Sequence, residues 1–344
     1  MLREGIIAFK AGKTISILVA LIMITQTGLA IAQAWIPDPQ PDYQLEVMPT
    51  VQHCSLASYP TSALDALDKN GNGYFTGKFT TARDPLKWYL NCLSFKVFGT
   101  PKLIPIFFNV GLIPLFYLLA KELTKDKMVT LIALLAFVAN PLYTQWIASG
   151  TYDQTWSFFL ILSAYLILKS KSYLSIPSFM LSITAKTLGF LYLPSFVYMV
   201  WVHTKDRLIT IGLVLVCLVP FVVIASDPSS SFIFGGELGF HPENFHSAFV
   251  DNFGMLAYEL PFLMIFGYLS WKYPPKKPNP ARKLCAVWIV NAWFITTIIY
   301  LFSNQFQFVY RFVPLAVFMS IFIAITINDL ARYYIEQKLE KPTV

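Results

Sequence analysis

The sequence predicts an all-α polytopic membrane protein with about ten transmembrane helices. Of its 344 residues, 56% are hydrophobic and only 13% are charged, about half the charged fraction of a soluble domain. Long apolar runs approach or reach the roughly 20 residues that a membrane-spanning helix needs. Along the chain, connections that are rich in Lys and Arg alternate with connections that contain few of them. A water-soluble protein is excluded, because so few charges cannot cover the surface of a chain of this size.

The candidate spans follow the apolar runs. We expect them at residues 14–34, 103–120, 128–147, 154–168, 173–185, 187–202, 208–225, 255–271, 284–302 and 309–330. The apolar stretch 173–202 is divided at Thr184-Ala185-Lys186 because a charge in the middle of a membrane is costly. The first span could also be a cleaved signal peptide, since a basic start precedes it and Ala-Ile-Ala-Gln-Ala ends it. Its apolar run is long for a signal, and we expect it to be retained as a helix.

The placement of Lys and Arg predicts the orientation. With a cytoplasmic N-terminus, the short inner segments hold 18 of the 26 basic residues, and the longer outer segments hold 8. This asymmetry is typical of cytoplasmic loops. We therefore expect both termini on the cytoplasmic side of a plasma membrane or an endoplasmic-reticulum-type membrane. The basic pI follows from this topology, and nucleic acid is not an expected partner.

The chain is expected to form one membrane domain, 1–344, with two long outer loops at 35–102 and 226–252. The first loop should carry two surface helices. "YPTSALDALDKNG" offers Thr61 or Ser62 as an N-cap before a glycine-rich stop. "DPLKWYLNCLSFKVFG" begins with Asp84 as N-cap and Pro85 at the first helical position, and Gly99 ends it.

The four cysteines divide between the first outer loop and the apolar spans. Cys54 and Cys92 lie in the outer loop, where a disulfide and two free thiols are the open alternatives. Cys217 and Cys285 fall in apolar helices, where we expect them in the core.

No metal site is predicted, although a divalent cation stays an open alternative. Asp68, Asn70 and Asn72 match the start of an EF-hand loop, but its twelfth position is Phe79 instead of the bidentate Glu. We interpret this stretch as a turn, because Asn and Gly tolerate left-handed conformations. The acids and histidines of the second loop fit no ligand pattern: Glu237, His241, Glu243 and His246.

Charged residues that interrupt the apolar pattern gather at the predicted outer ends of the helices. They are Asp38, Asp42, Glu46, Asp84, Asp153, Lys186 and Arg311. Each has a simpler structural explanation, since Asp is a common turn former and helix cap, and Lys or Arg can extend to lipid headgroups. Together, a carboxylate that takes a proton and cations that hold an anion are what transfer chemistry on a lipid phosphate requires.

The order of elements resembles the GT-C superfamily of polytopic glycosyltransferases, in particular the protein O-mannosyltransferase and aminoarabinose-transferase branch. Four pieces carry the resemblance. They are "WIPDPQPDYQLE" after the first span, the run from "GYFTGKFTTARDPLKW" to "FYLLAKELT", the hairpin "LLAFVANPLYTQWIASGTYDQTWSFFLILSAYLIL", and the pair "SITAKTLGFLYLPSFVY" and "QFQFVYRFVPLAVFMSIFIAI". The family's His-Pro-Pro-Leu position reads Arg83-Asp84-Pro85-Leu86 here.

The resemblance implies a sugar transfer from a polyprenyl- or dolichyl-phosphate donor on the extracytoplasmic face, with inversion. It implies Asp42 as catalytic base, with Asp38 as second choice, and Asp153 as a further catalytic residue. Arg311 and Lys186 would hold the lipid phosphate. Three further residues could support this site: Asp84, Tyr152 and Tyr310.

The expected partners are a lipid-linked sugar donor, membrane lipids, and an acceptor on a protein, lipid or glycan. No nucleotide-binding module or glycine-rich phosphate loop is apparent in the sequence, which favours a lipid-linked donor over a nucleotide sugar. Two alternatives stay open: a catalytically silent accessory subunit of a membrane complex, and a transporter or flippase.

Overall fold

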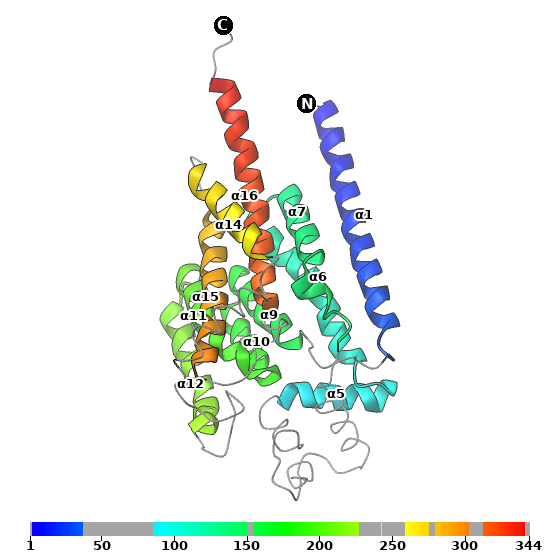
Figure 1. The fold of residues 1–344 in the computed structure, drawn as a ribbon, viewed down its shortest axis with the longest axis vertical. Helices are drawn as coiled ribbons and strands as arrows, with labels where there is room; N and C mark the ends of the chain where they lie inside the picture. Colours follow the sequence, from blue (N-terminus) through cyan, green and yellow to red (C-terminus); the bar gives the residue numbers. More distant parts are fainter. Residues whose placement is uncertain are drawn as a thin grey trace, which may run out of the picture.

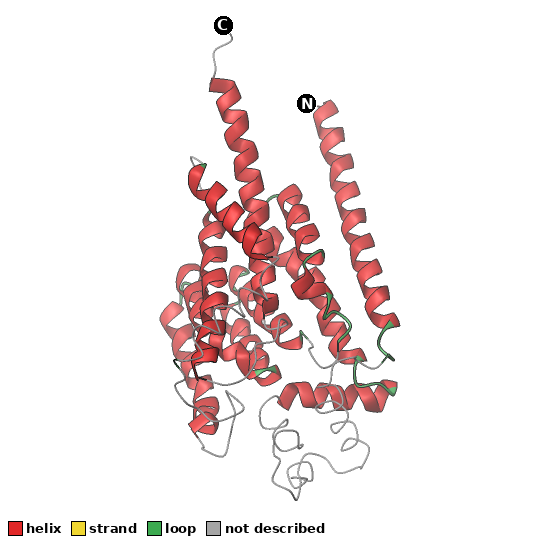
Figure 2. Ribbon diagram, viewed as in Figure 1, coloured by secondary structure: helices red, strands yellow, loops and turns green. Residues whose placement is uncertain are grey.

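The computed structural model describes residues 2–36, 85–149, 154–226, 242, 259–274, 279–302 and 312–340. Figure 2 shows helices and no strand in this part of the chain. The helices are α1 (Leu2–Ala32), α5 (Pro85–Phe98), α6 (Leu103–Thr124), α7 (Lys127–Val138), α8 (Pro141–Thr144), α9 (Thr155–Leu168), α10 (Ser172–Ala185), the 3-10 helix η2 (Thr187–Tyr192), α11 (Leu193–His203), α12 (Arg207–Ser226), α14 (Glu259–Lys272), α15 (Pro280–Phe302) and α16 (Val313–Glu340). The all-α prediction is confirmed for the described residues.

Each of the ten predicted spans overlaps a helix. Among the described residues, three helical stretches are long and apolar enough to cross a membrane: Thr14–Ala32, Leu103–Thr124 and Val313–Tyr334. Shorter apolar helices account for several of the others. An integral membrane protein follows from these stretches, while the number of ten spans stays a prediction.

Two ends of the molecule can be distinguished. The N-terminus of α1 and the C-terminus of α16 lie at one end, and α5 lies across the opposite end (Figure 1). We call these the termini end and the α5 end. The positive-inside pattern predicts that the α5 end is extracytoplasmic.

The surface helix α5 has the predicted bounds. It begins at Pro85, whose fixed φ angle suits the first helical position. It ends before Gly99, which adopts a φ of 69° and donates its N–H to the Phe95 carbonyl. A positive φ costs glycine little, so Gly99 is a suitable stop. The other predicted surface helix lies outside the described residues, as does nearly all of the second outer loop.

The predicted division at Lys186 is confirmed. Helix α10 ends at Ala185, and Lys186 has an extended backbone with φ −159° and ψ 125°. The chain then turns through η2 into α11. The span predicted as a continuous helix at 187–202 therefore starts with a tighter 3-10 turn.

The predicted span 128–147 is also interrupted. Helix α7 ends at Val138, and Asn140 caps the short helix α8 by accepting the Leu142 N–H at 2.8 Å. Because Pro141 disfavours a helical conformation at the residue before it, the Asn-Pro pair breaks the helix.

Helix α16 lies in the centre of the bundle and α1 at its edge. In their apolar windows, 78% of residues are buried in α16 but only 17% in α1. Helix α16 packs on α15, α7 and α14, whereas α1 contacts mainly α6 and α7. Stacked rings of Trp288 and Phe318, 4.4 Å apart, join α15 to α16.

The cysteines meet the predictions in part. Cys285 is buried in α15, but Cys217 is exposed on α12 because that helix packs on the bundle with only one face. Cys92 in α5 takes part in a disulfide bond. Its predicted partner, Cys54, lies outside the described residues.

Candidate functional site at the α5 end

Among the predicted site residues, only Lys186 is described. The other seven lie outside the described residues: Asp38, Asp42, Asp84, Tyr152, Asp153, Tyr310 and Arg311. The structure does, however, describe residues next to most of them and shows what holds these neighbouring residues in place.

Lys186 sits at the junction of α10 and η2 and is only 9% exposed. Its backbone is fixed on both sides. The Lys186 N–H donates to the Ser182 carbonyl at 3.0 Å, and the Lys186 carbonyl accepts the Gly189 N–H at 2.9 Å. The base of this side chain is therefore held rigidly, as a residue that binds a ligand requires.

A close approach between η2 and α10 maintains the junction. A Cβ atom on Gly189 would lie 2.7 Å from Ser182 Oγ and 3.0 Å from the Ser182 carbonyl carbon. Only glycine fits at this distance. Ser182 Oγ in turn donates to the Trp156 carbonyl at 2.8 Å, which ties α10 to α9.

Asn109, fully buried in α6, holds the connection between α8 and α9. Its Nδ2 donates to the carbonyls of Trp146, Ile147 and Ser149 at 3.3, 3.0 and 3.1 Å. Its Oδ1 accepts the Gln154 N–H at 2.6 Å. Asn109 thus binds the chain on both sides of residues 150–153, the segment that contains Tyr152 and Asp153.

Lys102 and Thr100 hold the end of α1. Lys102, only 3% exposed, donates from Nζ to the carbonyls of Gln33 and Ile36 at 3.2 and 2.7 Å. Thr100 Oγ1 donates to the Ala34 carbonyl at 2.8 Å. These bonds satisfy carbonyls that follow the last helical turn. They also fix the chain two residues before Asp38.

Helix α5 packs on α6 and α10 at this same end. Its first residue, Pro85, follows Asp84 directly. Asn91 of α5 is 2% exposed, and its Oδ1 has no hydrogen-bond partner in the described part of the chain. The start of α6 therefore supports three neighbouring features: the end of α1, the helix α5 and the α8–α9 connection.

Sequence reasoning identified Lys186 but missed Asn109 and Lys102. A signal for Asn109 existed, because a lone amide in the apolar run "LIPIFFNVGLIPLF" needs buried partners. Lys102 precedes the span by one residue and was assigned simply to the loop. Its partners lie 66 and 69 residues away in the chain, at a distance that no local pattern reveals.

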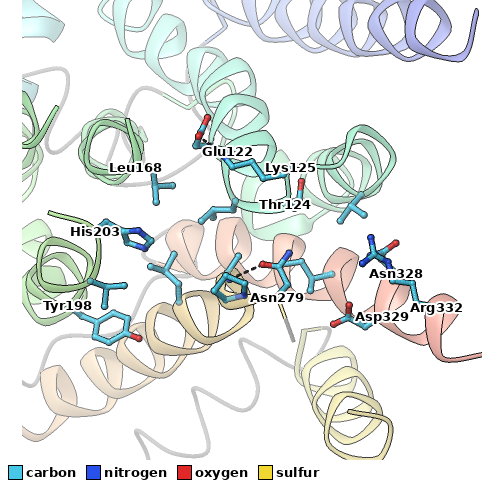
Figure 3. A pocket seen from close by; sticks show the side chains of 17 residues that line it. Glu122, Thr124, Lys125, Leu168, Tyr198, His203, Asn279, Asn328, Asp329 and Arg332 are labelled. Atoms are coloured by element: carbon cyan, nitrogen blue, oxygen red, sulfur yellow. Dashed lines mark hydrogen bonds and ion pairs between the residues drawn. The ribbon is translucent and has the colours of Figure 1, made fainter. Parts of the chain in front are cut away.

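No group of three or more His, Cys, Asp or Glu side chains that could hold a metal ion occurs among the described residues. The four candidate ligands of the second outer loop lie outside them. A cavity of about 520 Å³ is present, but it lies at the termini end and contains none of the predicted site residues (Figure 3).

Comparisons with known proteins agree with this architecture. The bundle of apolar helices with a surface helix across one end is similar in fold to a solved structure. No protein-family model matches the chain, and no match is found among curated proteins.

One solved structure with a similar fold is ArnT from Cupriavidus metallidurans bound to undecaprenyl phosphate. The TM-score is 0.59 at 14% sequence identity, and the match covers 94% of this chain. It covers 63% of the ArnT chain. At this identity the likeness shows the fold alone.

Proposed function

We propose that this protein is a membrane glycosyltransferase that moves a sugar from a polyprenyl- or dolichyl-phosphate donor to an acceptor at the α5 end. The observation that carries the proposal is the fold shared over 94% of the chain with a protein solved with undecaprenyl phosphate. A buried lysine at the α5 end supports it, as do the polar contacts that hold the chain next to two acid-bearing segments.

In the proposed reaction, Lys186 and Arg311 hold the phosphate of the donor. Arginine offers a planar fork of donors to phosphate oxygens, and lysine offers a compact charge. Both stabilise the negative charge that develops on the leaving lipid phosphate.

The acceptor enters from the extracytoplasmic side, and Asp42 or Asp38 takes the proton from its hydroxyl group. The hydroxyl oxygen attacks the anomeric carbon, the bond from that carbon to the phosphate oxygen breaks, and the lipid phosphate leaves. A single displacement inverts the anomeric configuration. Asp153 orients the acceptor, while Asp84, Tyr152 and Tyr310 support the charged groups.

The test is sugar transfer by the full-length protein in proteoliposomes that contain tritium-labelled undecaprenyl-phosphate sugars and a membrane extract as the source of acceptor. Removing a general base typically lowers the rate about 100- to 10,000-fold. We expect such a loss for Asp42→Asn or Asp38→Asn, with no loss for Asp206→Asn, an exposed acid at the termini end.

Three results would contradict this proposal. Full activity of both Asp38→Asn and Asp42→Asn would remove the assignment of the base. Movement of labelled lipid across the bilayer without sugar transfer would indicate a transporter or flippase. Stoichiometric co-purification with a partner, together with transfer that is insensitive to both substitutions, would indicate an accessory subunit.

A further inference from the structure

The cavity at the termini end lies far from the proposed transfer site. The ends of α6, α9 and α11 form it, with α7, the start of α15 and the last turns of α16 (Figure 3). Its volume of about 520 Å³ falls in the range of ligand-binding sites. The following residues line its apolar part: Leu123, Val129, Leu168, Val202, Pro280, Ala281, Leu284 and Ile325.

The pocket has a polar rim above this apolar wall. Figure 3 shows His203 and Tyr198 on one side and Asp329 with Arg332 on the other. Lys125 joins the rim from the α6–α7 connection. Here the apolar parts of several helices give way to charged residues, which is typical of the headgroup level of a membrane. An amphiphile with a polar head suits such a site better than a wholly polar solute.

Asp329 is the feature that points to a ligand. It is 5% exposed, and its Oδ2 accepts no hydrogen bond in the described part of the chain. Arg282 is the nearest cation, and its Nη1 lies 3.8 Å from Asp329 Oδ2. Its Nη2 donates to the Ser270 carbonyl. A buried carboxylate oxygen without a donor is costly. A ligand that brings an N–H or O–H group would remove this cost.

The charges around the pocket favour a zwitterionic ligand. Glu122 forms ion pairs with Lys125 and with Lys169, the latter at 2.5 Å. The bond to Glu122 raises the pKa of Lys169. The charged side chains that line the pocket are two cations and two carboxylates: Lys125, Arg332, Glu122 and Asp329. This near balance gives an anionic lipid little net attraction.

We propose that this pocket binds the headgroup of a phospholipid with a primary amine, of the phosphatidylethanolamine type, from the leaflet at the termini end. The ammonium group donates to Asp329, and the phosphate lies towards Arg332 and Lys125. Phosphatidylcholine presents the same phosphate, but its quaternary ammonium has no N–H to donate. Asp329 therefore distinguishes the two lipids.

The experiment measures lipid binding to the full-length protein in detergent by native mass spectrometry, without any sugar donor. The probes are phosphatidylethanolamine, phosphatidylcholine and phosphatidylglycerol with identical acyl chains. One hydrogen bond to a charged group contributes enough to change affinity about tenfold. We expect phosphatidylethanolamine to bind about tenfold more tightly than phosphatidylcholine.

Variants assign this preference to single residues. Asp329→Asn should remove the preference for phosphatidylethanolamine. Asp206→Asn, which removes one carboxylate outside the pocket, should retain this preference. Arg332→Gln should weaken the binding of phosphatidylethanolamine and phosphatidylcholine to the same extent. Equal binding of all three lipids by the wild-type protein would overturn the proposal even if Asp329→Asn does not fold. Phosphatidylglycerol binding as tightly as phosphatidylethanolamine would overturn the assignment of the amine.

Discussion

Asn109 shows how much one polar residue contributes to this membrane protein. Its side chain forms four hydrogen bonds to the backbone on both sides of residues 150–153, and Tyr143 Oη donates to the Asn109 carbonyl at 2.8 Å. No water is present in a bilayer core to replace these bonds. The described residues on both sides of the segment that contains Asp153 therefore depend on Asn109 for their position.

Asn109→Ala should destabilise the protein by about 2–4 kcal/mol, because it leaves buried backbone groups without partners. Asn291→Ala is the matched control, since Asn291 donates from Nδ2 to Ser195 Oγ at 2.7 Å, a bond to a side chain instead of to the backbone. Thermal unfolding in detergent checks the difference. A melting temperature for Asn109→Ala equal to that of Asn291→Ala would refute the role assigned to Asn109.

At this scale, the sequence could identify Lys186 because its charge interrupts an apolar run of 30 residues, 173–202. It could not identify what Lys186 and Asn109 contact. The bonds of Asn109 cross 37 to 45 residues, and their partners are backbone groups that carry no side-chain signature.

Among the elements, α5 and the α10–η2 junction were predicted well because their limits depend on local chemistry. Proline and glycine limit α5, and a lysine ends α10. The break between α7 and α8 was missed although Asn140-Pro141 is a local signal, since the apolar composition continues across it. The contact of the α5–α6 connection with the end of α1 depends on tertiary packing and had no local signal.

The contact between Lys102 and the end of α1 can be tested by substitution. Lys102→Met removes the two bonds to the Gln33 and Ile36 carbonyls and keeps the length of the side chain. We expect faster hydrogen exchange at residues 33–36 and slower sugar transfer, because the chain before Asp38 is released. Lys96→Met, at an exposed position on α5, is the control. Unchanged exchange at 33–36 in Lys102→Met would show that this contact does not hold the segment.

The two ends of the molecule have different proposed roles. The α5 end carries the proposed transfer site, and the termini end carries the pocket proposed for a lipid headgroup. The sequence predicted the helical class and the order of elements, because hydropathy and the distribution of Lys and Arg depend on the membrane itself. It did not predict the pocket, whose lining comes from six separate helices and two connections and becomes visible only in three dimensions.

The proposed transfer site is tested most directly by a density map of the full-length protein in nanodiscs with undecaprenyl phosphate. We expect phosphate density between Lys186 and Arg311 at the α5 end, within about 3–4 Å of the Lys186 ammonium group. The Asp38–Asp42 segment should lie beside the same phosphate. Phosphate density elsewhere, with Lys186 and Arg311 in separate places and no opening to lipid between them, would contradict the proposed transfer site.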